Sequence, residues 1–172
     1  MRVLLLLAAL VCAGCSDLDE GVPPPVQRTI PGLSSATYRH FVQAVQPGAE
    51  EYFVQDVHPP ADGADWRWTG RRPTFRFELA ETQGVNLHVH FGVNGHVLAA
   101  AGGALTVTFL VNGRELDRIR YDREGSQRFA KPVPTEWLRE GEPTIVTLEL
   151  DRTLKTDTVE YGLVLESVGF LE

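Results

Sequence analysis

His88 and His90 stand two residues apart in a stretch where every second residue is apolar. Such alternation predicts a strand, in which side chains two residues apart share a face and lie about 7 Å from each other. Two imidazoles at that spacing can share a metal ion, and His96 could return through a loop as a third nitrogen ligand. The alternative is that the intervening apolar residues face the core, which leaves both histidines on a plain solvent face or against a bound ligand. We expect no cofactor, and keep these three histidines as the set that would hold a metal.

Two tryptophans form a second group with the chemistry of a binding site. Trp66 and Trp68 are also two residues apart, so one face of a strand carries both rings, and aromatic faces can stack on the apolar faces of sugar rings. The competing interpretation is that Trp68 closes the end of the core. Arg71 follows closely, and an arginine fork binds carboxylates and phosphates, although a solvated turn explains it equally well. The candidate ligand-binding residues are therefore Trp66, Trp68, Arg71, His88 and His90.

Sequence motifs of enzymes are absent. The chain contains no G-x-S-x-G, H-E-x-x-H, G-x-x-x-x-G-K-S/T or G-x-G-x-x-G pattern. A glycosidase needs two carboxylates placed about 5–10 Å apart across a cleft, and no pair among the 23 acidic residues stands out. We therefore expect no catalytic residues and no enzymatic activity.

The N-terminus carries a targeting signal. Arg2 precedes the apolar run Val3–Val11, which is far too short to span a bilayer as a helix, and small residues then lead to Cys15. This pattern resembles the lipobox of bacterial lipoproteins, although Cys12 stands where that family prefers leucine. The resemblance implies a signal peptide over residues 1–14 and a lipidated Cys15, with palmitate among its acyl chains. It further implies anchoring in the cell envelope, in the outer membrane. An ordinary secretory signal is the alternative.

Length, charge and cysteine content restrict what the rest can be. The 172 residues suffice for one domain, and the formal net charge of −7 argues against nucleic acid as a partner. Cys12 and Cys15 are the only cysteines, so the domain must rely on its core without a disulfide. Residues 15–35 include three consecutive prolines and predict a lipidated N-terminus with a tether, which leaves residues 36–172 as the folded domain.

Period-two alternation dominates the domain. The clearest case is the stretch 105–121, in which Asn112-Gly113 predicts a two-residue hairpin turn and the return strand needs a bulge near Asp117. A phase change near Ser167 predicts either a second bulge or a strand buried on both faces. Eight or nine such strands, with one short helical turn near 135–139, predict an all-β, two-sheet antiparallel sandwich with jelly-roll topology.

The order of several short motifs resembles the galactose-binding-like jelly rolls that serve as carbohydrate-binding modules. The likeness covers about residues 50–172 and includes Trp66–Gly70, Val107–Gly113, Val133–Gly141 and Tyr161–Leu165. It makes a glycan plausible as the ligand. The sequence thus predicts a membrane-anchored, non-catalytic binding or protein-interaction module, which binds either a glycan or another envelope protein. A metal-binding protein or a small hydrolase is a further alternative. A groove lined by tryptophan and histidine would favour a glycan, and a broad flat apolar patch would favour a protein.

Overall fold

A computed structural model describes residues 40–172, so the expected signal peptide, Cys15 and tether lie outside the described residues. The strands are β1 (Phe41–Gln43), β2 (Phe53–Val57), β3 (Arg67–Glu78), β4 (Asn86–Val93), β5 (Leu105–Val111), β6 (Arg114–Tyr121), β7 (Gly125–Pro132), β8 (Pro143–Leu150), β9 (Leu154–Lys155), β10 (Glu160–Tyr161) and β11 (Val164–Leu171). The helical segments are η1 (Ala49–Tyr52), α1 (Gly95–Ala100) and η2 (Thr135–Trp137). Within residues 40–172, no helix is both long enough and apolar enough to cross a membrane.

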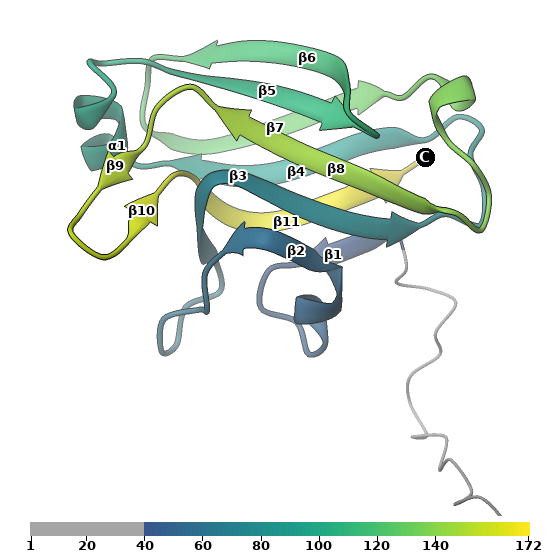
Figure 1. The fold of residues 1–172 in the computed structure, drawn as a ribbon, viewed down its shortest axis with the longest axis horizontal. Coiled ribbons are helices and arrows are strands. Elements are labelled where there is room, and N and C mark those ends of the chain that lie inside the picture. The colour runs from purple at the N-terminus through teal and green to yellow at the C-terminus, as the bar shows by residue number, and fades with distance from the viewer. Residues whose placement is uncertain (1–39) are drawn as a thin grey trace, which may run out of the picture. The chain divides into compact units, whose positions relative to one another are not determined.

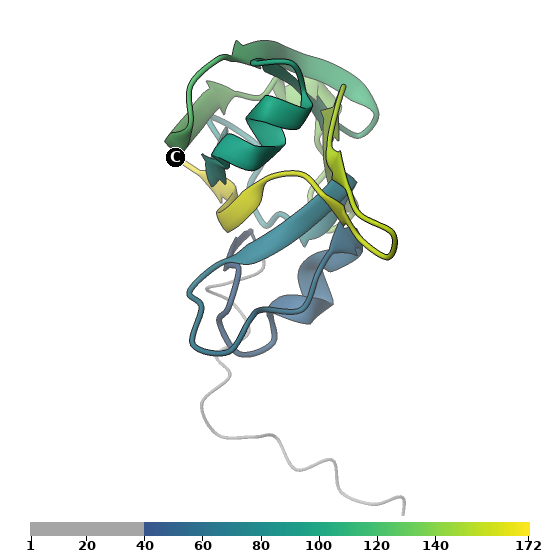
Figure 2. The ribbon, with the colours of Figure 1, turned by 90° about the vertical axis from the view of Figure 1, so that its left-hand side faces the viewer.

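All strand pairs are antiparallel, and they follow the order β6-β5-β8-β3-β11-β4-β7, with β1 added to β11 and β2 to β3. The long strand β3 joins two sheets, because its first residues pair with β11 and its last residues pair with β8 (Figure 1). We call β1, β11, β4 and β7 the first sheet, and β2, β3, β8, β5 and β6 the second sheet. A separate hairpin of β9 and β10 lies with α1 at one end of the domain (Figure 2).

The core lies between the inner faces of the two sheets. Phe109 of β5 stacks on Phe129 of β7, with ring centroids 3.7 Å apart and planes 3° apart. Phe77 of β3 meets Phe170 of β11 edge to face at 5.6 Å. Each of these ring pairs joins one sheet to the other, so the predicted all-β sandwich of jelly-roll class is confirmed.

The hairpin and both bulges are confirmed as well. Asn112 and Gly113 have φ values of 49° and 76°, the left-handed pair that a tight two-residue turn between twisted strands requires. The β5–β6 register shifts between Phe109 and Leu110, opposite Asp117 and Glu115. The β11–β4 register shifts between Leu165 and Ser167, which makes Glu166 the extra residue.

β3 is continuous through Pro73, because the chain passes there from pairing with β11 to pairing with β8. After β4 the chain forms α1, which begins where the Asn94 side chain accepts a hydrogen bond from the backbone N–H of His96 at 2.9 Å. The helical turn predicted near 135–139 is η2, with Pro134 at its N-cap.

Candidate functional site

Four aromatic side chains, Trp66, Trp68, Tyr161 and His58, form a continuous series that we call the aromatic row. Trp66 and Trp68 are 5.8 Å apart between ring centroids, at an interplanar angle of 83°. Tyr161 meets Trp68 edge to face at 5.2 Å, and His58 lies 6.1 Å beyond Tyr161. All four residues are half-buried, so each packs against protein on one side and keeps part of its surface in solvent.

Gly162 allows the segment that carries Tyr161 to approach the segment that carries Trp68 closely. Gly162, directly after Tyr161, donates its N–H to the Thr69 carbonyl at 2.7 Å. The next residue, Leu163, donates its N–H to the Thr69 hydroxyl at 2.9 Å. A Cβ at Gly162 would lie 2.4 Å from the Gly70 carbonyl oxygen, so only glycine allows this approach of the two backbones. The approach sets Tyr161 against Trp68.

A charged pair lies on the β9–β10 hairpin, which also carries Tyr161. The Glu160 carboxylate accepts a hydrogen bond from the Thr153 hydroxyl and lies 3.5 Å from Lys155 Nζ. The hydrogen bond from Thr153 and the nearby Lys155 charge lower the pKa of Glu160, which keeps this carboxylate ionised. His58 Nε2 donates to the Glu160 backbone carbonyl at 2.9 Å. The row is thus joined to this hairpin through the His58 hydrogen bond and the Tyr161 ring.

His88 and His90 lie on the outer face of β4, where they alternate with fully buried neighbours, as the pattern predicts. His90 Nε2 lies 2.8 Å from the Ser126 hydroxyl oxygen on β7, and His90 Nδ1 lies 3.0 Å from Glu166 Oε2 on β11. The sequence interpretation missed Ser126 and Glu166, because neither shares a local motif with His90. The only available signal was the phase change near Ser167, which marks the bulge where Glu166 lies.

The three histidines do not form a metal site in the described part of the chain. Both ring nitrogens of His90 are engaged by Ser126 and Glu166. His96 lies in the first turn of α1. Residues 40–172 contain no group of three or more histidine, cysteine, aspartate or glutamate side chains arranged to hold a metal ion.

Trp68 of the aromatic row and the His90 group share one face of the first sheet. Trp68 pairs with Val164, Val164 pairs with Gly92, and Gly92 pairs with Ser126. Directly paired residues of antiparallel strands project to the same side, so these four residues form a line across the sheet. Three strand spacings separate its ends, about 14 Å in total. Gly92 has no side chain, so only Val164 covers the middle of the line.

Arg71, in contrast, is hydrogen-bonded to the second sheet. Its guanidinium donates to the carbonyls of Leu150 and Asp151 at 3.2 and 3.3 Å. It lines an open groove of about 480 Å³ there, together with Thr106, Thr108, Arg118, Glu149, Leu150 and Asp151. The five candidate residues therefore lie in two regions. Trp68, His88 and His90 share a sheet face, and Trp66 adjoins it through its contact with Trp68.

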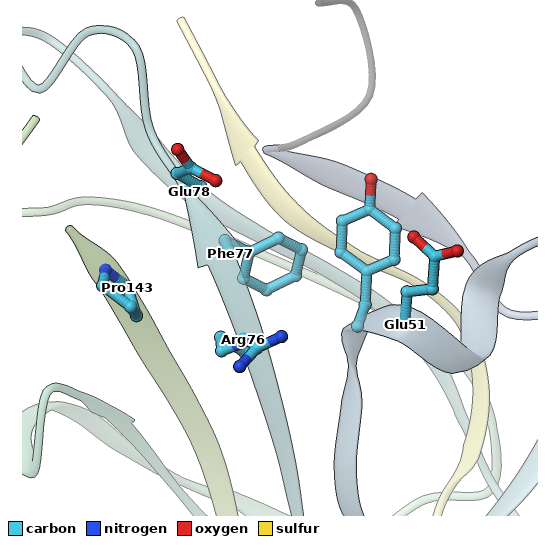
Figure 3. Close-up of a pocket in the computed structure, with 6 residues that line it drawn as sticks. Glu51, Arg76, Phe77, Glu78 and Pro143 are labelled. Atoms are coloured by element: carbon cyan, nitrogen blue, oxygen red, sulfur yellow. The ribbon is translucent and has the colours of Figure 1, made fainter. Parts of the chain in front are cut away.

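A separate hollow of about 430 Å³ lies between η1 and the end of β3. Figure 3 shows Arg76, Phe77 and Glu78 in succession on β3, with Glu51 across from them on η1. Pro143 and Tyr52 complete the lining. None of the residues predicted from the sequence lines this hollow, and we assign it no role.

The chain matches no family model and no curated protein. It is similar to the solved structure of a family 35 carbohydrate-binding module from an environmental isolate, with 11% identity and a TM-score of 0.46 over 77% of this chain and 92% of that one. It is also similar to an exo-β-1,3-galactanase from Phanerochaete chrysosporium, with 12% identity and a TM-score of 0.42 over 77% of this chain and 29% of that one. A third is a family GH115 4-O-methyl-α-glucuronidase with specificity for decorated arabinogalactans, with 16% identity and a TM-score of 0.38 over 62% of this chain and 14% of that one.

Proposed function

We propose that this protein is a glycan-binding module and that the aromatic row is its binding surface. The observation that carries the proposal is the half-exposed corner made by Trp66 and Trp68, whose rings are 5.8 Å apart and nearly perpendicular. A sugar ring can stack its apolar face on one indole while its edge contacts the other. Tyr161 supports the corner by packing edge to face against Trp68.

The polar surroundings of the row support the same ligand class. Sugar hydroxyls need both acceptors and donors, and the ionised Glu160 carboxylate and the Lys155 ammonium provide one of each on the hairpin that carries Tyr161. A site with apolar walls and a few convergent polar groups is typical of small-molecule recognition.

The exposed apolar surface argues against a protein partner as the main ligand. In residues 40–172 the exposed large hydrophobic residues are Val54 on β2 and Leu171 on β11, two strands that do not pair with each other. Docking surfaces for proteins are normally contiguous apolar patches. The described surface therefore fits a glycan better than a protein-docking role.

Replacement of Trp66 by alanine tests the proposal. Wild-type full chain is titrated against a panel of glycans by calorimetry, and the best binder is measured again with Trp66→Ala. Loss of one stacked ring should weaken binding about tenfold, which corresponds to roughly 1.4 kcal/mol. Trp137→Ala is the matched control, because Trp137 is half-buried far from the row, next to Arg114. Equal affinity of the wild type and Trp66→Ala, or no glycan bound by the wild type, would overturn the proposal.

We further propose that Cys15 is lipidated and anchors the module in the bacterial envelope, at the outer membrane. The support is the small-residue sequence before Cys15, which precedes the described residues. Cells expressing wild-type chain or Cys15→Ala are fed labelled palmitate and fractionated. The wild type should carry label and sediment with membranes, whereas Cys15→Ala should do neither. An unlabelled wild type would refute lipidation.

A further inference from the structure

We propose that Ser126, His90 and Glu166 form an ester-cleaving site on the outer face of the first sheet. The Ser126 hydroxyl oxygen lies 2.8 Å from His90 Nε2, and Glu166 Oε2 lies 3.0 Å from His90 Nδ1. A carboxylate can only accept, so the proton sits on Nδ1 of the neutral ring and Nε2 accepts from the Ser126 O–H. This order of nucleophile, base and orienting carboxylate is the one that activates a serine, and it is recognised by geometry rather than by sequence position.

The three side chains are held by three neighbouring strands. β4 carries His90 between Ser126 on β7 and the bulge of β11 that presents Glu166. The bulge is itself fixed, because the N–H of Ala44, just after β1, donates to the Glu166 carbonyl at 2.8 Å. Glu166 therefore acts as a positioning residue for the His90 ring.

The group is open to a substrate. Ser126 is exposed, and the side chains of His90 and Glu166 keep 29% and 36% of their surface in solvent. An ester can reach the hydroxyl without any rearrangement of the strands. In this exposure the group differs from buried hydrogen bonds, which a substrate cannot reach.

Donors for a developing oxyanion are present on the same side. β7 pairs with β4 alone among the described strands, so its other edge is open to solvent. Arg128 is the register partner of His90 on β7, two residues from Ser126, so it shares their face and is exposed. The N–H groups of a guanidinium are a type of donor that stabilises a tetrahedral oxyanion.

The chemistry needs only an ester and water. Ser126 Oγ attacks the acyl carbon while His90 Nε2 takes the hydroxyl proton, and the carbonyl electron pair moves onto the oxygen. When the tetrahedral intermediate collapses, the bond from the acyl carbon to the alkoxy oxygen breaks, and the His90 proton passes to that oxygen. Water then attacks the acyl-serine with His90 again as base, which yields a carboxylic acid and restores Ser126.

The position of Trp68 indicates the substrate class, and this step rests on the proposed glycan binding. Trp68, Val164, Gly92 and Ser126 form one line across the sheet face. A glycan stacked in the aromatic row and extending along that line passes over the bare Gly92 backbone toward Ser126. We infer that the substrate is an O-acylated glycan, with the acyl ester as the bond that is cleaved.

This inference departs from the expectation of no enzymatic activity. That expectation rested on the absence of sequence motifs. Residues 90, 126 and 166 come together only through strand pairing, so no local pattern in the sequence could report them.

A fluorophosphonate probe tests the site without involving any glycan. Full chain is incubated with the probe and the modified peptide is identified by mass spectrometry, while hydrolysis of p-nitrophenyl acetate gives a rate. We expect labelling at Ser126 that is abolished in Ser126→Ala. His90→Gln should lower labelling and hydrolysis about 100-fold or more, since a positioned base contributes about 10²–10⁴. Ser167→Ala is the matched control, because Ser167 is the register partner of His90 on β11, and it should label like the wild type.

A conservative pair tests the positioning role of Glu166. Glu166→Gln should reduce the labelling rate, whereas Glu166→Asp, which keeps the carboxylate, should recover most of it. Equal rates for these two variants would show that the carboxylate does not orient His90 and would overturn the triad. Thermal melts confirm that all variants are folded.

Two results separate this inference from the proposed function. A wild type that binds a glycan but labels no faster than Ser126→Ala overturns the ester-cleaving site and leaves glycan binding intact. A wild type labelled at Ser126 that binds no glycan supports the site and overturns the proposed function. Acetate release from an acetylated polysaccharide by the wild type, and not by Ser126→Ala, supports the assignment of the substrate class.

Discussion

Gly169 lies opposite Phe41 where β1 pairs with β11, and its replacement by alanine should be strongly destabilising. Its φ is +154°, and a Cβ there would lie 2.3 Å from the His40 carbonyl oxygen and 2.4 Å from Phe41 Cα. Both contacts are with backbone atoms, so no side-chain rotation relieves them. The hydrogen bond from the Phe170 N–H to the same His40 carbonyl, at 2.6 Å, holds the two strands at this distance.

The cost follows from two contributions. A non-glycine residue at such a φ costs about 1–3 kcal/mol. Relief of the clash requires β1 to move away from β11, which exposes Val42, now 0% exposed, at a cost of about 1.5–3 kcal/mol. The expected loss in the free energy of unfolding is therefore about 2.5–6 kcal/mol, which lowers the melting temperature of a domain of this size by about 10–25 °C.

Urea unfolding and calorimetric melting of Gly169→Ala measure this loss. The matched control is Gly84→Ala: Gly84 also has a positive φ, +68°, but a Cβ there would meet no atom within 4 Å. The control therefore isolates the conformational cost, about 1–2 kcal/mol. If Gly169→Ala lost no more stability than Gly84→Ala, the close packing of β1 on β11 would be refuted.

Two further predictions concern the core and the acid stability. Phe109→Ala should cost about 3–5 kcal/mol in urea unfolding, because it removes a fully buried ring stacked on Phe129, whereas Thr108→Ala on the outer face should cost far less. The hydrogen bond from Arg67 lowers the pKa of Glu50 in the folded state. The ionised Glu50 carboxylate therefore stabilises the fold above its unfolded pKa of about 4.3, and this stabilisation is lost as the pH falls through the lower, folded pKa. Glu50→Gln should therefore flatten the decline in stability between about pH 5 and pH 3, and an unchanged decline would contradict this assignment.

The fold was readable from the sequence wherever one face of a strand is buried and the other is not. Buried and partly exposed residues alternate strictly along β4 and β5, and the residue types of Asn112-Gly113 predict the turn conformation that is observed. The sequence was less informative at Pro73. A strand that passes from one sheet to the other buries different faces along its length, so the alternation of apolar and polar residues is interrupted. α1 was missed because a helix of six residues is too short to show a 3.6-residue period.

The candidate site was readable only in part. The spacing of Trp66 and Trp68 correctly places both rings together, because two residues on one strand face need no information about other strands. Tyr161 and His58 join them from distant positions, through the hairpin β9–β10 and the end of β2. Such partners depend on strand order, which a single sequence does not state. The hypothesis of a metal site at His88 and His90 did not anticipate that Ser126 and Glu166 contact the two ring nitrogens of His90.

The bulge of β11 connects stability to the proposed chemistry. An extra residue in a strand turns its side chain out of the regular alternation, and here it directs Glu166 toward His90 Nδ1. β1 holds this bulge through the Ala44 N–H, and Gly169 lets β1 approach closely enough to do so. Displacement of β1 in Gly169→Ala should therefore slow the labelling of Ser126, even under conditions where the variant remains folded. An unchanged labelling rate in the folded variant would show that β11 holds the Glu166 bulge without help from β1.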